Sequence, residues 1–138
     1  MKVHYSSEKN SWPTPKKLFD ELNKEYLFDL DPCATHENAL CPYYYTKEDD
    51  GLSLPWIGTV FMNPPYGREI GKWVIKAHEE NKKGCCVVCL LPARTDTAWF
   101  HDYCLKHEVI FLRGRLCFGD DKKKRAPFPS CIVVMRGR

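Results

Sequence analysis

An asparagine followed by two prolines and a tyrosine, at positions 63–66, carries the clearest chemical signal in the sequence. The Asn63 side-chain carbonyl and the Pro64 backbone carbonyl are both hydrogen-bond acceptors, while Pro64 and Pro65 stiffen the turn and remove two competing N–H donors. Two fixed acceptors of this kind form a socket for an –NH₂ group. The Tyr66 ring that follows has a flat face on which a base can stack.

This socket suits the exocyclic amine of adenine, which is a poor nucleophile because its lone pair is conjugated with the ring. Acceptors on both of its hydrogens favour a more tetrahedral nitrogen, whose lone pair then points at an electrophile. A plain strand-to-loop turn closed by two prolines is the alternative interpretation. Asn63 before the prolines and Tyr66-Gly67 after them favour the chemical interpretation.

The elements that must position these residues alternate between strand and helix patterns. A short buried strand is predicted to end at Phe61, and an earlier one covers Leu27 to Asp31. Between them, the interval from Cys33 to Thr59 is too short for a complete strand-helix-strand unit. Trp12 to Pro15 predicts a helix start, with Thr14 as N-cap and the helix running to about Lys24.

The remaining elements lie after the motif. They are a helix from Ile70 to about Gly84, a strand over Cys85 to Leu91, a helix capped by Asp96 or Thr97, a strand over Glu108 to Leu112, and an antiparallel hairpin of Leu116 to Phe118 with Ser130 to Met135. This order predicts an α/β, Rossmann-like fold. We expect a mostly parallel sheet that is reduced by one strand-helix unit and ends in the antiparallel hairpin.

Length and composition predict one domain. With 138 residues and 43% hydrophobic content, the chain can form one core and is too short for two ordinary domains. We expect a flexible arm over residues 1–11 and a single domain over 12–138. No apolar run is long enough to cross a membrane and the first ten residues lack a signal region, so we expect a cytoplasmic protein with eight reduced cysteines.

Cys86 and Cys89, with His78 and Glu80 upstream, are superficially similar to a zinc deaminase site. However, Cys86 and Cys89 fall in a predicted strand, where residues three apart point to opposite faces. We therefore expect both to be core residues and expect no metal.

Seven stretches of the chain resemble known enzymes. Asn63-Pro64-Pro65-Tyr66 resembles the catalytic tetrapeptide of S-adenosylmethionine-dependent amino-methyltransferases, some of which act on RNA bases or protein glutamine. Six more stretches, in order, are similar to the phage-type DNA N6-adenine methyltransferase family: Trp12-Pro13-Thr14-Pro15, Asp31-Pro32-Cys33-Ala34, Glu48-Asp49-Asp50-Gly51-Leu52, Leu91-Pro92-Ala93-Arg94-Thr95-Asp96-Thr97, Gly114-Arg115-Leu116 and Pro127-Phe128-Pro129-Ser130. The ordered set is more specific than the tetrapeptide and implies the methyltransferase version of the Rossmann-like fold.

The resemblance implies a site for S-adenosyl-L-methionine. Its methionine part would lie against the Thr14 segment, its amino group would pair with Asp31 at the end of a strand, and its ribose or adenine would meet Asp50 or Asp49. An acidic surface turn is the plain alternative for these last two. The expected cofactor-binding residues are Trp12, Thr14, Pro15, Asp31, Pro32, Cys33, Ala34, Asp49 and Asp50; the expected catalytic residues are Asn63, Pro64, Pro65 and Tyr66.

A DNA-binding surface is expected near the basic run Lys122 to Arg125, which suits phosphates, although a solvated loop tip is the plain alternative. Phe118 and Phe128 bracket this run, and either is a candidate for the second face of a base sandwich. The expected DNA-contacting residues are Arg68, Arg94, Arg115, Phe118, Lys122, Lys123, Lys124, Arg125 and Phe128.

These residues predict methyl transfer from S-adenosylmethionine to adenine N6 in DNA, with the base flipped out of the duplex, in a bacterial or phage-infected cell. Selection of the target would come from loops, from the partner in a homodimer, or be loose; whether a restriction nuclease accompanies the enzyme is left open. Two alternatives remain. The same socket would hold an RNA base amine or a protein glutamine amide, and an inactive nucleic-acid-binding relative would keep the same fold.

Overall fold

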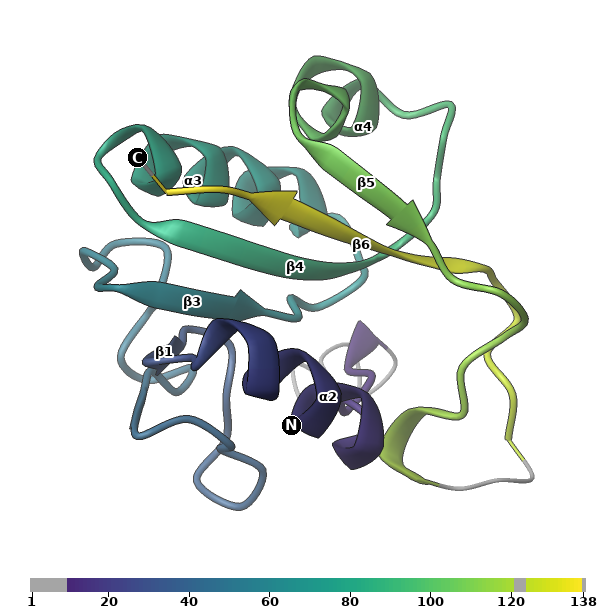
Figure 1. The fold of residues 1–138 in the computed structure, drawn as a ribbon, viewed down its shortest axis with the longest axis horizontal. Coiled ribbons are helices and arrows are strands. Elements are labelled where there is room, and N and C mark those ends of the chain that lie inside the picture. The colour runs from purple at the N-terminus through teal and green to yellow at the C-terminus, as the bar shows by residue number, and fades with distance from the viewer. Residues whose placement is uncertain (1–9, 121–123, 138) are drawn as a thin grey trace.

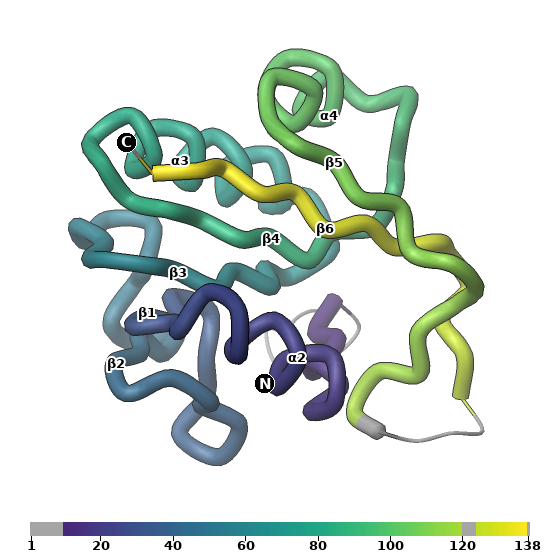
Figure 2. Tube along the Cα trace, viewed as in Figure 1, coloured from purple at the N-terminus to yellow at the C-terminus, as the bar shows by residue number. Residues whose placement is uncertain are grey.

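A computed structural model describes residues 10–120 and 124–137. Across these residues, six strands form one mixed sheet in the order β2-β1-β3-β4-β6-β5 (Figures 1 and 2). The strands are β1 Leu30–Asp31, β2 Tyr43–Tyr44, β3 Thr59–Met62, β4 Cys86–Pro92, β5 Glu108–Phe111 and β6 Ser130–Met135. The helices are α2 Lys16–Tyr26, α3 Ile70–Lys82 and α4 Ala98–Asp102, with 3₁₀ turns at Cys104–Lys106 and Phe118–Asp120.

The centre of the sheet is parallel, as predicted. β2, β1, β3 and β4 pair in parallel, and β3 and β4 are almost entirely buried because their side chains are apolar on both faces. Figures 1 and 2 show α2 in front of the sheet and α3 behind it. On the α2 side, the Phe19 ring meets Phe61 of β3 with ring centroids 5.2 Å apart. The α/β class with a mostly parallel sheet is confirmed.

The antiparallel part of the sheet is confirmed, but the prediction of a hairpin strand over Leu116 to Phe118 is wrong. β6 lies between β4 and β5 and pairs antiparallel with both. Both edges of β6 are therefore occupied, and a strand over Leu116 to Phe118 cannot pair with it. The Leu116 carbonyl instead accepts a hydrogen bond from Ala126 N at 2.8 Å, and Phe118 begins a 3₁₀ turn.

The reduced unit before β3 is also visible. Residues 32–58 contain no helix in the structure, and their one strand is the two-residue β2. This segment is held to β1 by Tyr43 N and Tyr45 N, which donate to the carbonyls of Asp29 and Asp31. Residues 32–58 therefore form a loop with little regular structure that is hydrogen-bonded to the chain at β1.

The start of α2 differs from the prediction. Pro15 occupies the N-cap position and makes no side-chain cap, so the assignment of Thr14 as N-cap is wrong. The helix continues to Tyr26 and ends at Leu27, whose φ of 54° is left-handed. This turn shortens the predicted strand to Leu30–Asp31. Thr97 does cap α4, accepting a hydrogen bond from Phe100 N.

Candidate active site

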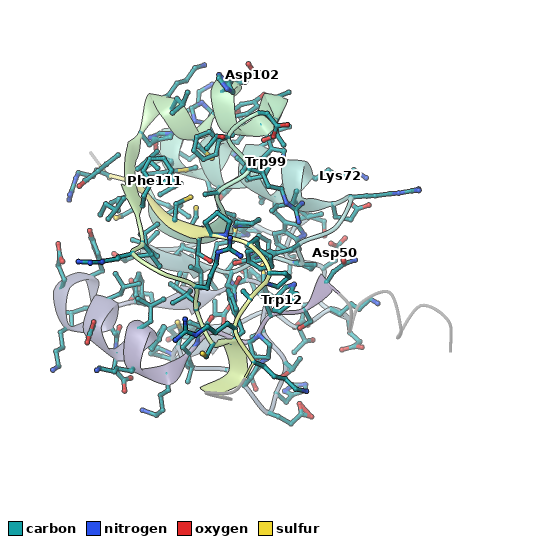
Figure 3. All side chains as sticks on the ribbon, turned by 90° about the vertical axis from the view of Figure 1, so that its right-hand side faces the viewer. Trp12, Asp50, Lys72, Trp99, Asp102 and Phe111 are labelled. Atoms are coloured by element: carbon teal, nitrogen blue, oxygen red, sulfur yellow. The ribbon has the colours of Figure 1, made fainter. Side chains whose placement is uncertain are left out.

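The carboxyl ends of β1 and β3 deliver Asp31 and Asn63 to one cavity of about 310 Å³. This is within the size range of small-molecule sites, roughly 300–1,000 Å³. Figure 3 looks toward this end of the sheet. The residues that line the cavity are Ser11, Trp12, Pro13, Thr14, Lys16, Asp31, Cys33, Asn38, Leu40, Asn63, Pro64, Pro65 and Gly119. The predicted partners Trp12, Thr14 and Asp31 therefore meet the Asn63-Pro64 turn.

The two ends of the Asn63 carboxamide differ sharply in their hydrogen bonding. The nitrogen Nδ2 donates to the Trp12 carbonyl at 2.6 Å and to Thr14 Oγ1 at 3.0 Å. The oxygen Oδ1 is buried and has no hydrogen-bond partner among the described residues. Leaving a buried acceptor unpaired costs roughly 1–3 kcal/mol, so this oxygen is a strong candidate to accept a bond from a ligand in the cavity.

Asp31 is a buried carboxyl with one described hydrogen bond, from Cys33 N to Oδ1 at 3.0 Å. Its exposed fraction is 9%. Desolvation raises the pKa of Asp31 to about 7, and the bond from Cys33 only partly opposes this. A cation placed in the cavity would stabilise the ionised carboxylate and lower that pKa again.

A second cavity of about 420 Å³ adjoins the first and shares Ser11, Cys33 and Pro65 with it. Of the predicted cofactor residues, Pro32, Ala34 and Asp50 line this second cavity. Gly51 is required here by close packing, because a Cβ at this position would lie 2.5 Å from the Pro32 carbonyl oxygen. The two cavities therefore share part of their walls, with Asp31 lining the first and Asp50 lining the second.

Two predicted cofactor residues lie outside both cavities. Asp49 closes a turn: its Oδ2 accepts from Thr46 N at 2.8 Å and Thr46 Oγ1 at 3.0 Å, and these bonds lower the pKa of Asp49. Pro15 is buried at the start of α2. Asp50 is therefore the better ligand candidate of the acidic pair, and the role of Asp49 in the structure is to shape the loop.

Tyr66 is buried, with 3% of its surface exposed, and does not line either cavity. Its hydroxyl donates to the Leu90 carbonyl at 2.9 Å, and burial raises its pKa well above the usual value. The rings of Phe118 and Phe128 lie 6.1 and 5.6 Å from it. A base that stacks on Tyr66 must therefore displace at least part of this packing, so stacking stays a prediction.

The sequence does not show which of Phe118 and Phe128 would contact the base, and in the structure both rings contact Tyr66 of the motif. Each also contacts Trp12, at centroid distances of 5.4 and 5.1 Å, and they lie 5.9 Å from each other. We call Trp12, Tyr66, Phe118 and Phe128 the aromatic cluster. It lies next to Asn63 and offers the apolar faces that a nucleobase needs.

The predicted DNA-contacting residues are more dispersed. Arg94 donates to the Tyr66 carbonyl and Arg115 to the Ala126 carbonyl, both at 3.4 Å. Arg68, Lys124 and Arg125 are exposed. Lys122 and Lys123 lie outside the described residues. Arg94 is thus tied to the motif, while the others remain predictions about a surface.

Asn10 and Ser11, which the sequence predicts as the end of a flexible arm, were not expected in the candidate site. Both line the second cavity, and the Asn10 carbonyl accepts a hydrogen bond from Tyr66 N at 2.8 Å. Gly67 reflects this contact, because a Cβ there would collide with the Asn10 side chain. Trp73, assigned to the core face of a helix, also lines the second cavity. Gly67 indicates a close approach, but nothing in the sequence identifies Asn10 as the neighbour.

Cys86 and Cys89 both lie on β4, as the sequence predicts. Cys89 is buried and Cys86 is half-buried. The Glu80 carboxylate accepts a hydrogen bond from Trp56 N at 2.9 Å and forms a salt bridge with Lys76 at 3.2 Å. Across residues 10–120 and 124–137, no group of three or more His, Cys, Asp or Glu residues is arranged to hold a metal ion. In the same ranges, no helix is long and apolar enough to span a membrane.

Comparison with known proteins gives consistent matches. A family model described as DNA N-6-adenine-methyltransferase (Dam) matches residues 3–136. The DNA N-6-adenine-methyltransferase of Escherichia phage T1 is 37% identical over 92 residues, which cover 64% of this chain and 38% of that protein. The DNA N-6-adenine-methyltransferase of Haemophilus phage HP1 is 31% identical over 112 residues, covering 77% of this chain and 64% of that protein.

A third relative, the putative methyltransferase YfdM of Escherichia coli, is 37% identical over 65 residues, covering 41% of this chain and 71% of that protein. The chain spans less than two thirds of the length of the two phage proteins.

Proposed function

Because the chain belongs to the DNA N-6-adenine-methyltransferase (Dam) family, which its match over residues 3–136 shows, we propose that it transfers a methyl group from S-adenosylmethionine to the N6 amine of adenine in DNA. The observation that carries this proposal is the buried Asn63 Oδ1, which has no partner among the described residues and lies beside Pro64 at the cavity. An acceptor pair of this kind suits an amine with two hydrogens.

Within the proposal, Asn63 and the Pro64 carbonyl hold both hydrogens of the amine and orient its lone pair. When bound, S-adenosylmethionine supplies a methyl group made electrophilic by its sulfonium. The protein's remaining task is to align the two reactants and exclude water. Neither Asn63 nor Pro64 is basic, so the proton that leaves the nitrogen must pass to solvent or to another group.

The cavities support the proposed cofactor on chemical grounds. The Asp31 carboxyl, buried with one described hydrogen bond, is a suitable partner for the cofactor's ammonium group. Pro32, Ala34 and Trp73 provide apolar walls for a nucleoside in the second cavity, and Asp50 provides an acceptor for hydroxyls or a ring amine. Cys33 and Pro65 line both cavities and would contact the cofactor between its two ends.

The proposed DNA surface combines the aromatic cluster beside the Asn63-Pro64 turn with basic side chains from several loops. The aromatic cluster would receive the flipped base, and Arg68, Arg94, Arg115, Lys124 and Arg125 would meet phosphates, with Lys122 and Lys123 expected to contribute from outside the described residues. We place this activity in the cytoplasm of a bacterial or phage-infected cell, which the sources of the relatives support. A homodimer stays a prediction, testable by light scattering.

The test of this function offers tritium-labelled S-adenosylmethionine with unmethylated DNA, RNA or protein in separate reactions. The proposal expects label in N6-methyladenine from the DNA reaction. Label in RNA alone, in protein glutamine or in N4-methylcytosine would reassign the substrate while keeping the amine socket. Transfer to none of them would favour a nucleic-acid-binding protein without activity.

A further inference from the structure

The direction in which Asn63 points its oxygen is not fixed by Asn63 itself. A carboxamide can turn by 180° about its last bond and exchange its donor end for its acceptor end with almost no change in shape. In this chain the nitrogen end faces the Trp12 carbonyl at 2.6 Å and Thr14 Oγ1 at 3.0 Å. The oxygen end is the one left without a described partner.

The Trp12 carbonyl is decisive because a backbone carbonyl can only accept a hydrogen bond. If the carboxamide were turned, Asn63 Oδ1 would face the Trp12 oxygen at bonding distance, and two acceptors would repel each other. The NH₂ end would then face the cavity, where it could not hold another amine. Thr14 Oγ1, a hydroxyl that can accept as well as donate, gives the nitrogen a second bond that helps to hold the carboxamide in place once the Trp12 carbonyl has selected its orientation.

We propose that the Trp12 carbonyl and the Thr14 hydroxyl are positioning groups that set the Asn63 carboxamide with its oxygen toward the cavity. This inference rests on the proposed function, since the oxygen has a role there only if an amine is bound. It assigns Thr14 a contact with the catalytic side chain, in place of the N-cap role that the sequence favoured and distinct from a contact with the methionine part of the cofactor.

The same contacts explain why an aspartate would not replace Asn63 in this chain. A carboxylate would still offer an oxygen to the cavity, but its other oxygen would meet the Trp12 carbonyl without a hydrogen between them. Asn63→Asp should therefore lose activity, by about a hundredfold or more, although it keeps the shape and the acceptor. An Asn63→Asp enzyme as active as the wild type would contradict the inference.

The kinetic test compares Thr14→Val with Thr14→Ser. Valine keeps the shape and removes the acceptor, whereas serine keeps the hydroxyl. The expected result for Thr14→Val is a kcat lowered roughly tenfold with cofactor affinity changed less than about twofold, and Thr14→Ser should recover most of the rate. A Thr14→Val enzyme with weaker cofactor binding and unchanged kcat would make Thr14 a cofactor contact and overturn the inference.

A measurement without turnover separates this inference from the proposed function. In ¹⁵N-labelled protein, the Asn63 side-chain NH₂ resonance is identified by its disappearance in Asn63→Asp. We expect its protons to exchange slowly with solvent, and we expect exchange to become faster in Thr14→Val. If the wild-type Asn63 NH₂ exchanges as fast as an exposed amide, the positioning contacts are absent. If exchange is slow but no substrate is methylated, the contacts stand and the proposed function fails.

Discussion

The Asn63 side-chain nitrogen lies 2.6 Å from the carbonyl oxygen of Trp12, a residue 51 positions earlier in the chain. The Asn10 carbonyl makes a second bridge, to Tyr66 N at 2.8 Å. The segment before α2 is therefore hydrogen-bonded to both ends of the Asn63 to Tyr66 turn and belongs to the candidate site. This segment and the turn both line the first cavity.

Asp31→Asn should weaken S-adenosylmethionine binding by about tenfold or more, the effect expected on losing a charge-assisted hydrogen bond of 1.5–3 kcal/mol. Because the pKa of Asp31 is raised to about 7, wild-type affinity should increase as pH rises from about 5.5 to 7.5 and the carboxyl ionises. Calorimetric titrations across this range test both statements. If the affinity for S-adenosylmethionine did not depend on pH and were the same in wild type and variant, Asp31 would not be a cofactor-binding residue.

The same substitution should stabilise the free protein at alkaline pH. Between the unfolded pKa of about 3.9 and the folded value of about 7, the folded protein binds the proton more tightly, so stability falls as pH rises through this range. Asp31→Asn removes a penalty on the order of a few kcal/mol. Its melting temperature should exceed that of the wild type at pH 8 and approach it at pH 4.5. A variant less stable than the wild type at pH 8 would show that contacts in the free protein already offset the desolvation penalty of the ionised Asp31 carboxylate.

Asp50→Asn and Asp49→Asn form a matched pair with different expected effects. Asparagine tolerates the φ of 61° at position 50, so Asp50→Asn should leave the fold intact and weaken cofactor binding by several-fold. Asp49→Asn should instead lower thermal stability, because it weakens the two bonds from Thr46. Thermal melts with and without S-adenosylmethionine separate loss of cofactor binding from loss of stability. If Asp49→Asn lost cofactor binding and Asp50→Asn lost stability instead, our assignment of the two acids would be reversed.

The strands of the sheet and Thr14 illustrate which features the sequence could and could not predict. Apolar runs identified β3 and β4, because a strand buried on both faces leaves a local signature. The insertion of β6 between β4 and β5 leaves no such signature, since pairing across the sheet is non-local. The N-cap prediction for Thr14 is wrong for a related reason: capping rules describe neighbours in the chain, whereas the Thr14 hydroxyl accepts a hydrogen bond from Asn63, 49 positions later.

Tyr66→Phe should retain much of the methyl transfer, because stacking needs the ring and not the hydroxyl. Its stability should fall by about 1 kcal/mol, since the buried bond to the Leu90 carbonyl at 2.9 Å is lost. Chemical denaturation and the methylation assay give the two numbers. A folded Tyr66→Phe enzyme without activity would mean that the hydroxyl, through Leu90 or directly, has a role beyond stability.

Replacing Lys122, Lys123 and Lys124 with alanine should weaken DNA binding similarly for all sequences and flatten the dependence of log K on log salt concentration. Lys82→Ala, at the exposed end of α3, is the control and should change neither. Fluorescence anisotropy at several salt concentrations measures the slope. If the triple variant keeps the wild-type slope, the basic run is a solvated loop tip.

The proposed role of Asn63 as the acceptor for the amine is tested most directly by measuring methyl transfer by Asn63→Ala. Wild-type and variant protein are incubated with unmethylated DNA and labelled cofactor, the DNA is digested to nucleosides, and N6-methyladenine is quantified. We expect the variant to fold and bind S-adenosylmethionine nearly as the wild type does, while its transfer rate falls by about a hundredfold or more. A variant that methylates adenine at the wild-type rate would contradict the assignment of Asn63 as the acceptor for the amine.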